Sequence, residues 1–316
     1  MEIQKQSTRD GFGQGLLEAA RSDEQVVGLC ADLTESTKML AFAKEFPQRF
    51  IEVGVAEQNL AGLAAGFALA GKIPFTASYA CFHPANSWGV IRTSIAYSNL
   101  NVKIIGGHAG LVTGADGATH QSLEDIALMR VLPNFIVVVP CDYEEARKAT
   151  LALARHNGPA YLRTNKLDQE PITTKDTPFT LGQAIQLRAG RAATIIACGS
   201  VVQEALSAAT ILEQHNIDVR VLNMHTIKPL DTLSILNAAR ETGALITVED
   251  HQQIGGLGSA VAEVLAQSGR RVPFRSMGVA DTFGESGTAA QLLEKYELSA
   301  SHIVQQINEL LANTRK

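Results

Sequence analysis

Short apolar runs rich in β-branched residues alternate along this chain with segments of helical periodicity. In the first half the runs are nearly continuous in apolar residues, which is typical of parallel strands buried on both faces. The expected strands span residues 25–31, 101–106 and 135–140, and the expected helices span residues 11–20, 57–70 and 143–156. A β/α alternation of this kind favours a parallel sheet with helices on both faces. We therefore expect an α/β fold with three layers, α/β/α.

A polar segment separates this first series from a second one. Residues 165–178 contain two prolines and several charges and show no periodicity, which is typical of a linker. The second series has expected strands at 193–198, 218–223, 244–248 and 272–277, and expected helices at 202–215, 230–241, 258–269 and 299–311. The sequence thus predicts two α/β domains, residues 1–164 and 182–316, joined by a linker at 165–181.

Composition excludes several classes of protein. The 316 residues are 46% hydrophobic and 19% charged, which fits a compact fold with a large core. A net charge of −5 without any basic cluster disfavours binding to nucleic acid or to an anionic membrane. No apolar run reaches the roughly 18–20 residues that span a bilayer, and residues 1–7 lack the apolar core of a signal peptide. The four cysteines are widely spaced without a CxxC pair, so we expect reduced thiols and a cytoplasmic protein.

Glu57 stands at the start of an unusually apolar helical segment. Residues 60–70 are small and apolar, so we expect a helix buried almost all round, with Gly62 and Gly66 allowing close backbone approach. A carboxylate beside so much apolar surface is costly unless it is paired or shares a proton. Glu57 is accordingly a candidate proton-sharing acid. The alternative interpretation is an ordinary glutamate in a first helical turn, where the helix dipole favours it.

A glycine-rich loop follows the expected strand at 101–106. Residues 106–121 contain five glycines, two histidines and one aspartate, a composition that suits a loop shaped around a small polar ligand. The spacing of His108, Asp116 and His120 would also permit a metal site, although the intervening glycines leave its geometry open. Structural interpretations are a turn at Asp116 and a helix cap at His120 for a helix beginning near Ser122.

Four motifs occur in the order seen in transketolases. They are Asp-Leu-Thr-Glu-Ser at 32–36, Gly-Val-Ala-Glu at 54–57, Thr-Ala-Ser-Tyr-Ala-Cys-Phe at 76–82 and Gly-Ala-Asp-Gly-Ala-Thr-His-Gln at 114–121. Over essentially its full length, including residues 248–258, the chain resembles the C-terminal half of that family. This resemblance implies a pyrimidine-binding domain with a parallel sheet, followed by a transketolase C-terminal domain with a mainly parallel sheet.

The resemblance implies thiamine diphosphate as the cofactor. Glu57 matches the glutamate that hydrogen-bonds a ring nitrogen of the aminopyrimidine and thereby promotes activation of the cofactor. Phe82 matches the aromatic residue that stacks on the aminopyrimidine, and Tyr79 lies nearby, although both could be core aromatics. Asp32 and Leu33 are the further expected cofactor contacts.

The resemblance also implies substrate-binding residues. His108 matches a histidine that binds the sugar phosphate, Asp116 an aspartate that recognises a substrate hydroxyl, and His120 a histidine at the donor's first hydroxyl and carbonyl oxygen. With Glu57, the two histidines form the expected catalytic set. The remaining phosphate-binding positions match these residues: Ser36, Arg9 and either Arg163 or Thr164. Arginine suits such a site because it donates parallel hydrogen bonds. His251 has no transferable role, and a structural role is favoured.

Half of the family's cofactor site is missing from this sequence. Full-length transketolases hold the diphosphate and metal with a Gly-Asp-Gly motif followed by Asn, and the chain has no Gly-Asp-Gly. We therefore expect no metal ligands here. Mg²⁺ or another divalent ion would bind to a large partner subunit. Two copies of each subunit, a dimer of heterodimers, would transfer a two-carbon ketol unit from a ketose phosphate to an aldose phosphate.

Three alternatives stay open. Ala109-Gly-Leu-Val112 is also similar to deoxyxylulose-phosphate synthase, which usually has Arg where His108 stands. The β subunits of oxoacid dehydrogenases share the split arrangement but lack the paired-histidine loop. A non-catalytic, cofactor-binding regulatory subunit is disfavoured by the presence of Glu57, His108 and His120.

Overall fold

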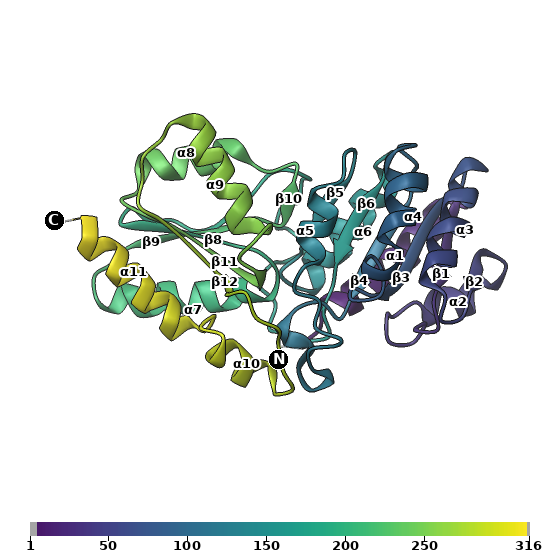
Figure 1. Cartoon of the computed structure of the whole chain (residues 1–316), viewed down its shortest axis with the longest axis horizontal. Coiled ribbons are helices and arrows are strands. Elements are labelled where there is room, and N and C mark those ends of the chain that lie inside the picture. Colours follow the sequence, from purple (N-terminus) through teal and green to yellow (C-terminus); the bar gives the residue numbers. More distant parts are fainter. Residues whose placement is uncertain (1–4, 315–316) are drawn as a thin grey trace.

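The computed structural model describes residues 5–314, which form two α/β units lying side by side (Figure 1). Within these residues the first sheet has seven strands in the order β10-β5-β6-β4-β3-β1-β2. All neighbouring strands among β1 to β6 pair in parallel. The strands are β1 (Val26–Cys30), β2 (Phe50–Glu52), β3 (Ile73–Tyr79), β4 (Lys103–Gly107), β5 (Ile136–Val138), β6 (Ala160–Arg163) and β10 (Thr226–Lys228).

Helices cover both faces of this sheet, as the β/α alternation predicts. One face packs against α1 (Thr8–Ser22), α2 (Leu40–Glu45) and α6 (Tyr143–Arg155), whose buried residues share a core with β1, β3 and β6. The other face packs against these segments: α3 (Glu57–Leu69), α4 (Trp88–Val90), the π-helical residues Ile91–Ala96 and α5 (Asp125–Arg130). The three-layer arrangement is confirmed.

The second sheet is mainly parallel, again as expected. In the described residues its order is β12-β11-β8-β9-β7, with β7 antiparallel to β9. Helices α8 and α9 lie on one face, and α7 and α11 on the other (Figure 1). The elements are β7 (Ile185–Arg188), β8 (Ala193–Ala197), α7 (Val202–Gln214), β9 (Val219–Asn223), α8 (Thr232–Glu241), β11 (Leu245–Gln252), α9 (Leu257–Ser268), β12 (Phe274–Val279), α10 (Ala289–Lys295) and α11 (Ala300–Thr314).

Strand β10 joins the two units. It belongs by sequence to the second half of the chain, yet it pairs antiparallel with β5 at the edge of the first sheet. Val139 N donates to His225 O at 2.7 Å, and Lys228 Nζ donates to Arg130 O at 3.0 Å. One hydrophobic core also runs through both units, from Ile126 to Leu257. The two halves therefore fold as interlocked parts.

The segment 165–181 between the units is held against the first one. The Asp142 carboxylate accepts from the Ile172 and Thr173 backbone N–H groups and from the Thr173 hydroxyl. A backbone bridge also pairs Gln6 with Gln169. The expected linker is therefore an ordered strap. None of the helices between residues 5 and 314 has the length and apolar character needed to cross a membrane.

Helix α3 differs from its prediction in one respect. The sequence predicts burial almost all round, but burial is confined to Leu60, Ala61, Ala64 and Ala65. Leu69 on the other face is 75% exposed, and the space beside Gly62 and Gly66 is open. The prediction is thus wrong for the single chain, because no other described element packs over this face.

His83 is a buried neutral histidine beside β3. Its Nε2 lies 2.8 Å from Thr76 Oγ1 and its Nδ1 lies 2.7 Å from Ser87 Oγ. Burial lowers the pKa of His83 to about 3. The unfolded chain binds a proton below pH ~6.5, whereas the folded chain does not. The stability contributed by neutral His83 is therefore complete above pH ~6.5 and is lost as the pH falls towards 3.

We expect His83→Gln to make the free energy of unfolding less dependent on pH between about 6 and 4. The expected difference in slope is up to one proton, or about 1.4 kcal/mol per pH unit. Urea unfolding over a pH series measures it, and His215→Gln at an exposed position is the control. Equal slopes in the wild type and His83→Gln would contradict the prediction.

Candidate active site

Most of the predicted site residues lie at the carboxyl-terminal edge of the first sheet, where its parallel strands end. Strands β2, β1, β3 and β4 are neighbours and parallel, so their carboxyl ends lie together. Glu57 follows β2, Asp32 and Leu33 follow β1, and His108 follows β4, while Tyr79 is the last residue of β3 and Phe82 comes three residues later. Motifs that are widely separated in the sequence are thereby brought to one place.

Glu57 is the first residue of α3 and is partly exposed. Its carboxylate makes no hydrogen bond or ion pair with any described residue. Gln58 Nε2 donates to Asn86 O at 3.2 Å, so the start of α3 lies close to the segment that follows Phe82. Burial, with smaller contributions from the charges of Glu124, Asp125 and Glu57, raises the pKa of the Cys81 thiol to about 12. The free carboxylate of Glu57 is available to a ligand.

Four rings form a continuous wall at the same carboxyl-terminal edge of the sheet, which we call the ring wall (Tyr79, Phe82, His108 and His120). The Tyr79 and His108 centroids are 3.9 Å apart. Phe82 stacks on Tyr79 at 6.0 Å and meets His120 edge-on at 5.4 Å. Tyr79 and Phe82 are both half-buried, so neither is an ordinary core aromatic. The wall offers exposed ring surface to a planar ligand.

His108 sits in the wall with a constrained backbone. Its φ is +51°, in the left-handed region that few residues other than glycine adopt. Arg9 Nη1 lies 3.3 Å from His108 Nε2, and because arginine can only donate, Nε2 accepts. Burial, aided by the charges of Arg9 and Lys166, lowers the pKa of His108 to about 3. The neutral ring therefore carries its proton on Nδ1.

Two buried donors at this point have no partner among the described residues, namely Arg9 Nε and His108 Nδ1. Arg9 is held in place because its Nη1 also donates to Ser36 O at 3.1 Å. Unpaired buried donors are costly, so they indicate a missing acceptor. The structure thus brings Arg9, Ser36 and His108 together from three segments, with two unpaired donors that an anion would satisfy.

The exposed part of the glycine-rich loop carries Asp116 and His120. Asp116 Oδ2 lies 2.7 Å from Lys166 Nζ, and the His120 ring pairs with Thr119 Oγ1 at 2.9 Å. Lys166 was not expected at the site, because it lies in the polar segment interpreted as the linker. His120 caps no helix, since α5 begins at Asp125.

Within residues 5–314 no three His, Cys, Asp or Glu side chains are close enough together to hold a metal ion. The metal interpretation of His108, Asp116 and His120 is therefore not supported.

Arg163 does not reach this site. Its side chain is 6% exposed, and its Nε donates to Asp125 Oδ2 at 2.9 Å. Its Nη2 donates to Ser122 O at 3.2 Å and to Asp250 O at 2.8 Å. Thr164 beside it is also buried. The prediction of a phosphate-binding role for Arg163 is wrong, because the guanidinium is used between the two units.

The other predicted residues, all within the described range, make no contact with the ring wall that supports a role in the site. Asp32 is exposed, with φ +58°, and its backbone N–H donates to Glu52 Oε1 at 2.6 Å. Leu33 packs partly against the core. Their cofactor contacts stay predictions. His251 is fully buried, accepts from Ala127 N at 3.4 Å and lies 2.7 Å from Gln252 O, which supports a structural role.

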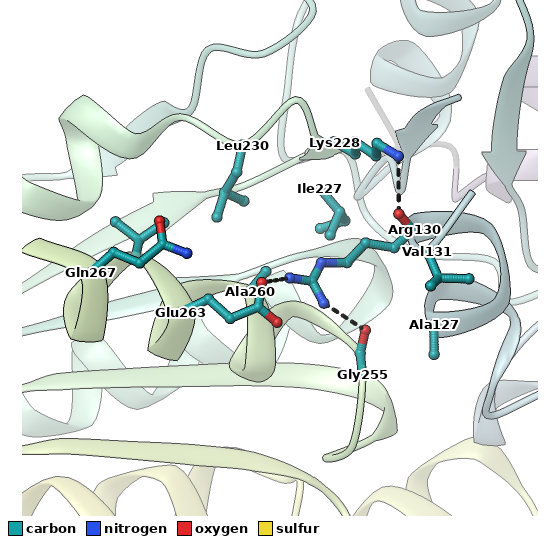
Figure 2. Close-up of a pocket in the computed structure, with 11 residues that line it drawn as sticks. Ala127, Arg130, Val131, Ile227, Lys228, Leu230, Gly255, Ala260, Glu263 and Gln267 are labelled. Carbon is teal, nitrogen blue, oxygen red and sulfur yellow. Dashed lines mark hydrogen bonds and ion pairs between the residues drawn. The ribbon is translucent and has the colours of Figure 1, made fainter. Parts of the chain in front are cut away.

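A cavity of about 640 Å³ between α5, β10 and α9 lies elsewhere (Figure 2). The charged side chains that line it already form ion pairs and hydrogen bonds with one another or with the backbone. Arg130 pairs with Glu263 and donates to Gly255 O, and Lys228 donates to Arg130 O. None of the predicted site residues lines it. We therefore assign the candidate site to the carboxyl-terminal edge of the first sheet, where the Glu57 carboxylate and two buried donors have no hydrogen-bond partner among the described residues.

Comparisons with known proteins match both halves of the chain to described families. Residues 4–170 match the family described as the transketolase pyrimidine binding domain, and residues 182–303 match the transketolase C-terminal domain. A putative transketolase C-terminal section of Methanocaldococcus jannaschii is 44% identical over 95% of both chains. The 6-deoxy-6-sulfo-D-fructose transketolase subunit SqwH of Clostridium sp. is 41% identical, covering 98% of this chain and 96% of that one.

Two further relatives are informative. One of the subunits of apulose-4-phosphate transketolase from Phocaeicola vulgatus is 40% identical, covering 93% of this chain and 94% of that one. A solved structure described as a split gene transketolase, inactive β4 tetramer, is 44% identical with a TM-score of 0.90. That similarity covers 97% of this chain and 98% of the other.

Proposed function

The chain belongs to the transketolase family, and we propose that it is the subunit of a split transketolase that supplies Glu57 and the sugar-binding loop. With a large subunit it would transfer a two-carbon ketol unit from a ketose phosphate to an aldose phosphate. The observation that carries this proposal is the meeting of a free carboxylate, a ring wall and unpaired donors at one sheet edge.

The residues at this edge fit the aminopyrimidine end of thiamine diphosphate. Bound there, the cofactor would supply the carbon nucleophile that takes up the ketol unit. Glu57 has a free carboxylate to share a proton with a ring nitrogen, and Phe82 has ring surface for stacking. Tyr79, Asp32 and Leu33 would complete the contact. The ligands for Mg²⁺ or another divalent ion would come from the large subunit.

The substrate end of the site fits an anionic sugar. Arg9 and His108 each present an unpaired donor, and Lys166 adds a second cation nearby. Ser36 lies beside Arg9, and we place it in the same anion site. Asp116 and His120 project from the exposed loop, where they would recognise the donor's hydroxyl and carbonyl oxygens. The names of two relatives specify a sulfonated and a phosphorylated sugar, which favours an anionic substrate here too.

The partner is a large subunit with the diphosphate-binding domain, in an assembly with two copies of each chain. Three exposed apolar side chains on α3 or directly before it support a covering partner: Val55, Leu63 and Leu69. A relative consisting of this type of chain is described as an inactive tetramer, which favours a need for the other subunit. Each of the four cysteines, all in the described range, is a free thiol, so we retain a cytoplasmic location.

Reconstitution with a large subunit tests the proposal. The pair, supplied with thiamine diphosphate and Mg²⁺, should cleave a ketose phosphate and pass the ketol unit to an aldose phosphate. Either chain alone should be inactive. Decarboxylation of pyruvate without ketol transfer would instead favour the synthase or dehydrogenase alternatives. Cofactor binding by the pair without turnover on any of these substrates would favour the regulatory alternative.

We expect Arg9→Gln to raise the KM for a ketose phosphate by about 10- to 100-fold, because a hydrogen bond to a charged group contributes roughly 1.5–3 kcal/mol. The KM for an uncharged ketose should change little. Steady-state kinetics of the reconstituted pair measure both values. Arg21→Gln, at an exposed site on the same helix, is the matched control. Equal effects of Arg9→Gln on charged and uncharged ketoses would contradict an anion-binding role.

A further inference from the structure

The glycine-rich loop is held at both ends by groups at the boundary with the second unit. We propose that Asp250 and Gln121 are positioning residues, which hold residues 108–122, here called the substrate loop, so that His120 stays in the ring wall and Asp116 stays close to His108. The C-terminal half of the chain would thereby set the geometry of a sugar site formed by the N-terminal half. This inference rests on the proposed function, because it concerns the same site.

Asp250, on β11, holds the first part of the substrate loop. Its side chain is 2% exposed. The Leu111 N–H donates to Asp250 Oδ1 at 2.8 Å, and the Val112 N–H donates to Oδ2 at 3.4 Å. Gly110 between the loop and this carboxylate has φ +84°, and a Cβ there would lie 2.1 Å from Asp250 Oδ2. This part of the loop is therefore fitted closely to the carboxylate.

Gln121 holds the last part of the loop. Its side chain is 4% exposed, and its Nε2 donates to Gly114 O at 3.0 Å and to Glu285 O at 2.9 Å. The segment 284–287 of the second unit packs directly on these groups. A Cβ on Gly284 would lie 1.9 Å from Gln121 Oε1, and one on Gly117 would lie 2.7 Å from Ser286 Oγ. Gln121 thus joins the loop to itself and to the second unit.

Arg163 provides a third connection. Its Nη2 bonds both Ser122 O, at the end of the loop, and Asp250 O, on β11. The Gly110 N–H also donates to Ser122 O at 2.9 Å, which closes the base of the loop. Between these fixed ends, Asp116 and Thr119 are exposed and His120 is half-buried. The side chains expected to contact the sugar therefore project from a loop whose two ends are hydrogen-bonded to the second unit.

Fixing the ends of the loop matters because the loop is rich in glycine. An unfastened glycine-rich segment loses much conformational entropy when a ligand orders it. Catalytic geometry is also sensitive, since a displacement of about 1 Å can cost roughly 10²-fold in rate. Removal of the hydrogen bonds that hold the loop ends should weaken substrate binding and slow ketol transfer. The cofactor contacts at Glu57 and Phe82 should stay in place.

Two isosteric variants test the proposal. In Gln121→Glu, a carboxylate replaces the amide donor and faces the Gly114 and Glu285 carbonyl oxygens. In Asp250→Asn, an amide nitrogen can face the Leu111 and Val112 N–H groups. Arg275→Gln, which removes a partly exposed ion pair with Glu309 on α11, is the control. If Gln121→Glu does not fold, Gln121→Met removes the same hydrogen bonds without adding charge.

The first readout is hydrogen exchange of the single chain, which requires no activity. Both test variants should exchange the amides of residues 108–122 at least about 10-fold faster than the wild type, and Arg275→Gln should not. The second readout is the reconstituted pair. There the KM for the ketose phosphate should rise at least about 10-fold at an unchanged dissociation constant for thiamine diphosphate.

Wild-type exchange in both test variants would overturn the proposal. So would a wild-type KM, or a loss of cofactor affinity equal to the loss of substrate affinity, which would indicate only general destabilisation. A wild-type pair without ketol transfer would count against the proposed function. In that case the exchange experiment would still decide whether Asp250 and Gln121 hold the loop.

Discussion

Replacing Glu57 with alanine is expected to lower the turnover number of the reconstituted pair by at least about 10²-fold, the usual size of a general acid–base contribution. The reason is that Glu57 lies at the same carboxyl-terminal edge of the sheet as the ring wall and its carboxylate is paired with no described residue, so it is available to hydrogen-bond a ligand. The measurement is kcat for ketol transfer at saturating cofactor.

Two matched variants sharpen this test. Glu57→Gln keeps the size of the side chain but cannot ionise, so it should lose nearly as much turnover as alanine. Gln58→Ala, at the next position of α3, removes a hydrogen bond to Asn86 and should retain most of the activity. Turnover near the wild-type value in both Glu57 variants would refute the proposed role of this residue.

The second large effect is expected on stability. Arg163→Met should reduce the free energy of unfolding by about 3–5 kcal/mol, the usual cost of removing one partner from a buried ion pair. Asp125 is fully buried and would keep its hydrogen bond from Tyr161 but lose its cationic partner. The carbonyl groups of Ser122 and Asp250 would also lose a donor. Urea unfolding of the single chain measures the change.

Arg21→Met is the control, because its ion pair with Glu45 is exposed and should contribute at most about 1 kcal/mol. Adding Asp125→Asn to Arg163→Met should cost less than the sum of the two single changes, since no unpaired buried charge remains. A loss from Arg163→Met no larger than that from Arg21→Met would contradict the structural role assigned to Arg163.

The sequence predicted elements with a continuous apolar or helical pattern well and the other elements poorly. The expected strand at 25–31 and helix at 143–156 agree with β1 and α6 to within one residue at each end. Both have strong, continuous patterns. By contrast, β3 contains Pro74 and several small residues, and β2 and β10 have three residues each, so periodicity could not reveal them. Their existence depends on neighbours that are distant in sequence.

The candidate site shows the same division. Glu57, Phe82 and His108 belong to local motifs and could be found from them. Arg163 was wrongly predicted to bind phosphate because successive strand residues point to opposite faces of the sheet. An offset of one residue in the alignment therefore moves a side chain to the other face. Lys166, Gln121 and Asp250 were missed because their partners lie in other segments. The apolar pattern of α3 predicts a fully covered helix, which fits the proposed assembly better than the single chain.

The pairing of β10 with β5 limits how a chain of this kind can be recombined during evolution or engineering. A fragment that ended at the strap would leave β5 as an open sheet edge, and such edges promote aggregation. A chimaera joined at residue 181 would receive this edge strand from a foreign sequence. Its β10 would have to match a β5 with which it had not co-evolved. Exchange of the C-terminal half therefore also changes the sheet on which the candidate site is built.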